Sequence, residues 1–140
     1  MIISAWSPWL TQDIEVLEKV QRRAVNMIVG LNSRTYEDKV NLTSLSDRRK
    51  KFDLLQACEI LNGFDRVSSD IWLKTVGEHN NRLIRITSYS KNLDSVRSRT
   101  DIRKNFFSNR VVNLWNNLPI DIQDSRTVKI FKNRLEQFKL

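Results

Sequence analysis

Residues 44–63 read SLSDRRKKFDLLQACEILNG, and this stretch carries the signals for both ends of a helix. Ser44 can accept a free backbone N–H as an N-cap, and Asp47 three residues later makes a variant of the capping box. Gly63 can adopt the left-handed conformation that ends many helices. The stretch therefore predicts a helix that begins near Ser44 and ends at Gly63. Its expected apolar stripe is Leu45, Phe52, Leu55, Cys58 and Leu61.

Helices are also predicted before this stretch. Ser7 as N-cap and Pro8 at the first helical position predict a helix that ends at Gly30, because proline lacks an N–H that the first turn would leave unpaired. A short helix carrying Tyr36 and Val40 is expected after residues 33–35. The expected apolar stripe of the first helix is Leu10, Ile14, Leu17, Ala24 and Ile28.

The second half of the chain predicts two further helices, after a loop at 65–78 with one helical turn at residues 71–73. Ser108 opens a helix that Pro119 prevents from continuing. We expect residues 114–119 to have a structural role and not a binding role. The last helix is expected to begin near residues 125–127. The inward side chains should be Val111, Leu114 and Trp115 in the first of these helices, and Val128, Phe131, Leu135 and Phe138 in the second.

The helical spacing of apolar residues is interrupted at residues 82–87, where β-branched and apolar residues form a short run without helix caps. This run predicts a strand that pairs with residues 100–106 across a polar stretch. The expected fold is one mostly α (α+β) domain over residues 1–140, with about five helices and a small antiparallel β-hairpin near 82–106. Residues 1–78 would form its helical, charge-neutral part, and residues 79–140 a basic part with the hairpin and two C-terminal helices.

The composition supports a helical, folded chain. Of 140 residues 40% are hydrophobic, which excludes a disordered tail, and only three are glycine and two proline, which argues against a turn-rich all-β fold. One cysteine excludes a disulfide framework and a cysteine-based zinc site. Residues 1–10 lack a basic leader and are too short to span a bilayer, so we expect neither a signal peptide nor a membrane segment.

The net charge of +8 lies entirely in the second half of the chain. Residues 1–78 contain eleven cations and eleven acids, whereas residues 79–140 contain thirteen cations and five acids. Between residues 82 and 110, eight cations face only Asp94 and Asp101. A local excess of this kind indicates contact with a polyanion better than a diffuse one does.

The sequence predicts no catalytic or metal site and no cofactor. The single histidine, His79, lies in a polar stretch and is expected at the surface, and Cys58 on an apolar helix face is expected to be a buried thiol. Glu37 and Asp38 faintly resemble the Tyr-x-Asp-Asp turn of reverse transcriptases, but Lys39 stands where the second aspartate belongs. A solvent-facing helical turn explains these acids more simply than a two-metal site.

The candidate binding site is the basic segment around residues 97–104, which combines cations and hydroxyl groups with Phe106 and Phe107 next to them. Guanidinium and hydroxyl groups are the usual partners of phosphates, and an exposed aromatic ring can stack on an unpaired base. The alternative is that both phenylalanines belong to the core. For the basic run 48–51, a solvated helix face and a phosphate contact both remain open. The predicted nucleic-acid-binding residues are Arg82, Arg85, Arg97, Arg99, Arg103, Lys104 and Arg110.

Several phrases occur in the same order in one known family. The chain resembles the C-terminal region of reverse transcriptases from non-LTR retrotransposons of the jockey-like and chicken-repeat type. The matching phrases are residues 6–8 (WSP), 17–24 (LEKVQRRA), 27–31 (MIVGL), 36–38 (YED), 45–49 (LSDRR), 60–63 (ILNG), 97–101 (RSRTD), 106–112 (FFSNRVV), 115–119 (WNNLP) and 131–132 (FK).

The resemblance implies an accessory region rather than an enzyme, because the endonuclease, fingers and palm of that family are absent from this chain, as is the zinc knuckle of some relatives. Such a region is expected to hold template RNA or target DNA against the polymerase, inside the cell, in the nucleus or in a cytoplasmic ribonucleoprotein. The alternatives are a structural module that docks on the missing palm and thumb, and a truncated remnant without a role of its own.

Overall fold

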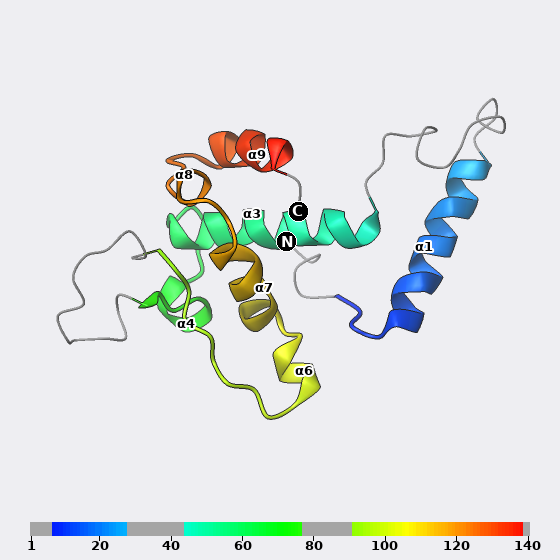
Figure 1. The fold of residues 1–140 in the computed structure, drawn as a ribbon, viewed down its shortest axis with the longest axis horizontal. Coiled ribbons are helices and arrows are strands. Elements are labelled where there is room, and N and C mark those ends of the chain that lie inside the picture. The colour runs from blue at the N-terminus through cyan, green and yellow to red at the C-terminus, as the bar shows by residue number, and fades with distance from the viewer. Residues whose placement is uncertain (1–6, 28–43, 77–90, 139–140) are drawn as a thin grey trace.

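The computed structural model describes residues 7–27, 44–76 and 91–138. In this part of the chain α3 lies at the centre, and α7 and α9 both pack against it, whereas α1 touches α3 only near its start (Figure 1). The helices of the described residues are α1 (Thr11–Asn26), α3 (Leu45–Leu61), α4 (Ser69–Trp72), α6 (Asp101–Lys104), α7 (Phe107–Asn116), α8 (Ile120–Gln123) and α9 (Val128–Gln137).

The predicted ends of the central helix are confirmed. Ser44 Oγ accepts the backbone N–H of Asp47 at 3.0 Å and donates to the Asp47 carboxylate at 2.9 Å, so one side chain satisfies a helix N–H and fixes the acid beside it. At the other end Asn62 is the C-cap, and Gly63 follows with a φ of 70°, in the left-handed region that favours glycine.

The predicted stripe of α3 is only partly right, because α7 and α9 cover the helix from two directions. Its buried side chains occupy a wide arc instead of a narrow stripe, and Phe52, expected inside, stays 36% exposed. Leu55 and Leu61 are half-buried at the margin of the core. The side chains of α3 that are buried are Asp53, Leu54, Gln56, Ala57, Cys58 and Ile60.

The core is centred on the indole of Trp115. Its ring stacks on Phe131 with centroids 5.7 Å apart, and its Nε1 donates to the carbonyl oxygen of Lys91 at 3.0 Å. The buried Gln123 donates from Nε2 to the carbonyl oxygens of Trp115 and Leu118 at 2.9 and 3.1 Å, and so satisfies the end of α7. These contacts confirm the structural role predicted for residues 114–119, with Asn117 as the C-cap.

A buried ion pair joins α3 to α7. Arg110 donates from Nε and Nη2 to the two carboxylate oxygens of Asp53, both at 2.8 Å, and the side chains are 17% and 5% exposed. Arg110 Nη1 also donates to the carbonyl oxygen of Asn105 at 3.1 Å. This bidentate geometry compensates both charges where little water reaches them.

The predicted β-hairpin is wrong where the structure describes it. Residues 101–104 form α6 instead of a strand, because Thr100 Oγ1 accepts the N–H of Arg103 as an N-cap and starts a helical turn. The first predicted arm, residues 82–87, lies outside the described residues. The only β pairing in the described ranges is an isolated antiparallel bridge between Thr75 and Leu93.

Besides its bridge with Thr75, Leu93 forms backbone hydrogen bonds with a side chain of α7. The N–H of Leu93 donates to Asn116 Oδ1 at 2.9 Å, and Asn116 Nδ2 donates to the carbonyl oxygen of Leu93 at 3.0 Å. An amide side chain of α7 thus occupies the backbone groups that a neighbouring strand would otherwise pair with. The fold class is therefore helical in the described residues rather than α+β.

The remaining helix predictions differ mainly at helix starts. α1 begins at Thr11 after Leu10, which lacks a side-chain cap, so Ser7 is not its N-cap. The predicted helical turn is present as α4, but it lies at Ser69–Trp72 instead of 71–73, and Leu73 is its extended C-cap. α9 follows Thr127, whose Oγ1 accepts the N–H of Ile130 at 3.3 Å. α7 begins at Phe107, one residue before the prediction, and α6 and α8 were not predicted. The predicted short helix after residues 33–35 lies outside the described residues.

In the described ranges, no helix combines the length and the apolar content that crossing a membrane requires.

Replacing Asp53 by Asn should lower the free energy of unfolding by about 3–5 kcal/mol, because the guanidinium of Arg110 would stay buried without a counter-charge. The matched control is Asp124→Asn, which removes the 2.7 Å pair with Lys91 where both side chains are about half exposed. That change should cost less than about 1 kcal/mol. Urea denaturation followed by tryptophan fluorescence measures both, and equal losses would contradict a structural role for the buried pair.

Candidate nucleic-acid interface

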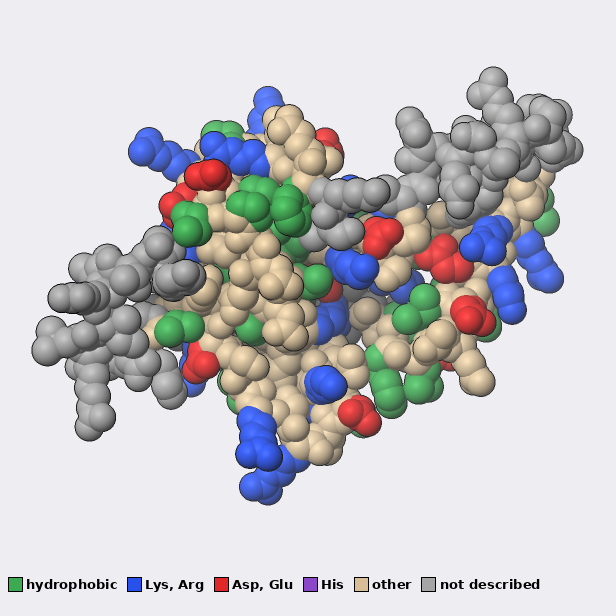
Figure 2. Space-filling view, viewed as in Figure 1, with side chains coloured by type: hydrophobic (Ala, Val, Ile, Leu, Met, Phe, Trp, Pro, Cys, Tyr) green, Lys and Arg blue, Asp and Glu red, His purple; other side chains and the backbone are tan. Residues whose placement is uncertain are grey.

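Four of the predicted phosphate-binding residues lie on one exposed segment. The side chains of Arg97, Arg99, Arg103 and Lys104 are exposed, and Asp101 is the only acid among residues 97–104. None of the four forms a salt bridge with another described residue. Figure 2 shows Lys and Arg side chains at the lower end of the molecule, where Figure 1 places α6 and the segment before it.

The backbone of this segment is held by α7, although its cations form no salt bridge within the part of the chain that the structure describes. Asn109 Nδ2 donates to Ser98 Oγ at 2.6 Å and to the carbonyl oxygen of Arg103 at 2.8 Å. Ser98 and Thr100, expected as phosphate partners, instead serve the fold, since Thr100 caps α6. The result is a fixed loop that carries four cations outward, which lowers the entropy lost on binding a phosphate chain.

Phe106 and Phe107 have different environments. Phe107 is 4% exposed and belongs to the core, which confirms the structural interpretation for one of the two rings. Phe106 remains 39% exposed and stacks on Trp72 from α4, with ring centroids 5.7 Å apart and an interplanar angle of 22°. The N–H of Phe106 donates to the carbonyl oxygen of Arg103 at 3.3 Å, so the aromatic pair lies directly beside the cationic segment.

The role of Trp72 was missed in the sequence, because it lies far from Phe106 along the chain. Trp72 is 38% exposed, so the stacked pair presents aromatic surface to solvent. The sequence signal for Trp72 is a short apolar run, Ile71 to Leu73, within a stretch that has a weak helical pattern.

Of the other three predicted residues, the structure describes only Arg110. Arg110 is a structural residue, because its guanidinium is neutralised by Asp53 and bonded to Asn105, and its side chain is 17% exposed. We therefore remove it from the predicted phosphate contacts. Arg82 and Arg85 lie outside the described residues.

The basic run 48–51 is largely used within the protein. Arg48 Nη2 donates to Gln21 Oε1 at 2.7 Å and links α3 to α1, while Lys50 pairs with Asp47 at 3.1 Å. Burial by itself would raise the pKa of Asp47, but hydrogen bonds from Ser44 and Lys50 and the charges of Lys50 and Lys51 hold that pKa below its ordinary value. Lys50 fits the predicted solvated helix face with a local acid partner, whereas Arg48 fits neither alternative, because it is partly buried in a contact between α3 and α1.

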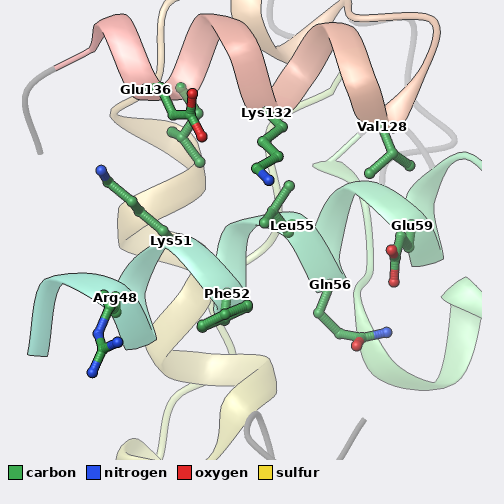
Figure 3. A pocket seen from close by; sticks show the side chains of 10 residues that line it. Arg48, Lys51, Phe52, Leu55, Gln56, Glu59, Val128, Lys132 and Glu136 are labelled. Atoms are coloured by element: carbon green, nitrogen blue, oxygen red, sulfur yellow. The ribbon is translucent and has the colours of Figure 1, made fainter. Parts of the chain in front are cut away.

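A groove of about 250 Å³ lies between α3 and α9. Its floor is apolar, with Phe52, Leu55, Val128 and Leu135, and Figure 3 shows Lys132 reaching from α9 over Leu55. Cations and acids alternate at the rim, where Lys51 and Lys132 are accompanied by Glu59 and Glu136. This mixture of charges lacks the single sign that selects an anion.

Of the candidates for chemistry, the structure describes only Cys58. Burial raises the pKa of the Cys58 thiol to about 11; the charge of Glu59 adds to this, whereas a hydrogen bond from Asn62 and the charge of Lys91 oppose it. No group of three or more His, Cys, Asp or Glu side chains in the described ranges is arranged to hold a metal ion. His79, Glu37 and Asp38 lie outside these ranges.

Comparisons of the chain with protein-family models, with curated proteins and with solved structures found no match.

Cys58 should be inert in the folded protein. With a thiol pKa of about 11, only about a thousandth of it is thiolate at pH 8, and the side chain is 1% exposed, so a reagent has neither a nucleophile nor access. We expect no reaction with DTNB at pH 8 until urea unfolds the chain, after which one thiol reacts. Fast modification of the native protein would contradict the buried position.

Proposed function

We propose that the chain is a non-catalytic nucleic-acid-binding region, equivalent to the C-terminal accessory part of a non-LTR retrotransposon reverse transcriptase. The single observation that carries this proposal is the fixed segment 97–104, whose four exposed cations lie beside the half-exposed pair Phe106 and Trp72. The bound polymer would be template RNA or target DNA.

The two parts of this surface suit the two parts of a nucleotide. The guanidinium and ammonium groups can neutralise consecutive phosphates and release their counterions, which makes binding depend on salt. The rings of Phe106 and Trp72 offer an apolar face on which an unpaired base can stack. A strand with unpaired bases can use both features at once, so single-stranded RNA is the first probe.

Binding should be steeply salt-dependent. With about four phosphate contacts, the slope of log K against log salt should be near −3 for a single strand, so affinity falls about 50-fold between about 50 and 200 mM salt. Fluorescence anisotropy of a labelled single-stranded RNA measures this slope. A slope near zero would overturn the phosphate mechanism.

A charge-matched pair of variants tests where the strand binds. Changing Arg97, Arg99, Arg103 and Lys104 to Gln should abolish the salt-dependent binding, because it removes the contacts. The control changes four other exposed cations to Gln and lowers the net charge equally; these are Arg66, Lys74, Arg126 and Lys129. The control should retain most of the affinity, and equal losses in both variants would show diffuse attraction instead of a site.

Phe106→Leu separates stacking from charge. The change keeps an apolar side chain against Trp72 but removes the ring, so affinity should fall by about tenfold, within the ~1–3 kcal/mol of one stacked base. The salt slope should stay the same, because no cation is changed. An unchanged affinity would limit the interface to phosphates.

The second candidate is a structural module that docks on the polymerase and thumb that this chain lacks. The observation that favours it is the exposure of Trp9 and Trp72, which are 46% and 38% exposed although tryptophan is usually well buried. Failure of both the chain and its control variant to bind RNA or DNA would favour this candidate.

A further inference from the structure

Helix α1 has apolar side chains on two nearly opposite sides. One side meets α3, where Val25 is buried, Glu18 accepts the N–H of Ser46 at 3.3 Å and Gln21 accepts from Arg48. The other side faces solvent. Its apolar members are Trp9, Val16, Val20 and Met27, which are 46%, 57%, 59% and 80% exposed.

The solvent-facing apolar residues have the sequence spacing that is typical of helices packed in pairs. Val16, Val20 and Met27 follow one another at steps of four and seven residues, which are the steps that keep side chains on one stripe of a packed helix pair. Trp9 lies just before the helix, whose N-cap is Leu10. At the start of this stripe an open hollow of about 430 Å³ is bounded by Pro8, Trp9, Asp13 and Val16. Surface helices of a monomer do not need a second stripe, so this one points to a partner helix.

Two charged residues on the same stripe specify the partner and its direction. Asp13 and Arg23 occupy stripe positions near opposite ends of α1. Two parallel copies of α1 would place Asp13 against Asp13 and Arg23 against Arg23. Two antiparallel copies centred on residue 18 place Asp13 against Arg23 twice, which is favourable.

The apolar members fit the same arrangement. In the antiparallel pair Val16 meets Val20 of the other copy on both sides of the two-fold axis, and Met27 approaches the segment before the helix of the other copy, which carries Trp9. Met27 is the most exposed of them, and a flexible thioether suits the open hollow beside Trp9.

We propose that a second copy of this chain docks on α1, antiparallel and two-fold symmetric, through Trp9, Asp13, Val16, Val20, Arg23 and Met27. A helix of 16 residues is about 24 Å long. Such a pair buries less than the ~1,000 Å² of a strong interface, so the dimer is weak and forms with rising concentration. The proposal goes beyond nucleic-acid binding and does not involve residues 97–104.

Sedimentation equilibrium of the full chain over a wide range of concentration tests this dimer. The wild type should move from monomer to dimer and not to larger species. Asp13→Arg and Arg23→Asp should each weaken the dimer by at least about tenfold, because each places like charges together twice. The double variant Asp13→Arg/Arg23→Asp restores opposite charges and should restore the dimer.

Glu15→Arg is the matched control, because Glu15 is an exposed acid of the same helix that lies off the stripe. It should leave the dimer unchanged, and circular dichroism should show the same helix content in all variants. A wild type that stays monomeric would overturn the proposal and leave this face to another protein. Equal effects of Glu15→Arg and Asp13→Arg, or a double variant that stays monomeric, would also overturn it.

Discussion

The buried pair of Asp53 and Arg110 is the contact on which the rest of the structure depends. It crosses from α3 to α7 in the interior, where each charge without the other would be strongly unfavourable. The same turn of α7 also holds the surface: Arg110 donates to Asn105, and Asn109 donates to Ser98 and Arg103. One helical turn thus fixes the core and the backbone of the cationic segment together. A disturbance of this pair is therefore felt at the candidate interface.

The candidate interface is defined by four exposed cations within eight residues, beside a partly exposed aromatic pair. Lys50, Lys91 and Arg110 each form a salt bridge, and Arg48 bonds to Gln21. Arg97, Arg99, Arg103 and Lys104 have no such acid among the described residues, so their field extends into solvent. Phe106 and Trp72 add apolar surface beside them. The groove between α3 and α9 mixes both signs, because Arg48, Lys51 and Lys132 are accompanied there by Glu59 and Glu136. This contrast is why the proposed nucleic-acid contact is at residues 97–104 and not at the groove.

The two halves of the described structure differ in how they are stabilised. α3, α7 and α9 enclose a core in which Leu54, Trp115 and Phe131 are almost wholly buried, whereas α1 buries only Val25 fully. A 16-residue helix gains little stability alone and depends on packing of its apolar side chains. The exposed apolar side chains of α1 are therefore available to pack against another chain. An accessory region that pairs through α1 would carry two cationic segments, which increases its effective affinity for one long strand without any new contact.

Local signals in the sequence determined the helical class, the ends of α3, the start of α9 and the stop after α7, because caps, glycine and proline act on neighbouring residues. They also placed Phe131, Trp115 and Cys58 inside and concentrated the charge at residues 97–104. The tertiary structure alone decided that Asp53 neutralises Arg110, that Trp72 stacks on Phe106, and that Asn116 occupies the backbone of Leu93 in place of a strand. These contacts join residues far apart in the chain, and each depends on how helices pack, which a local pattern does not encode.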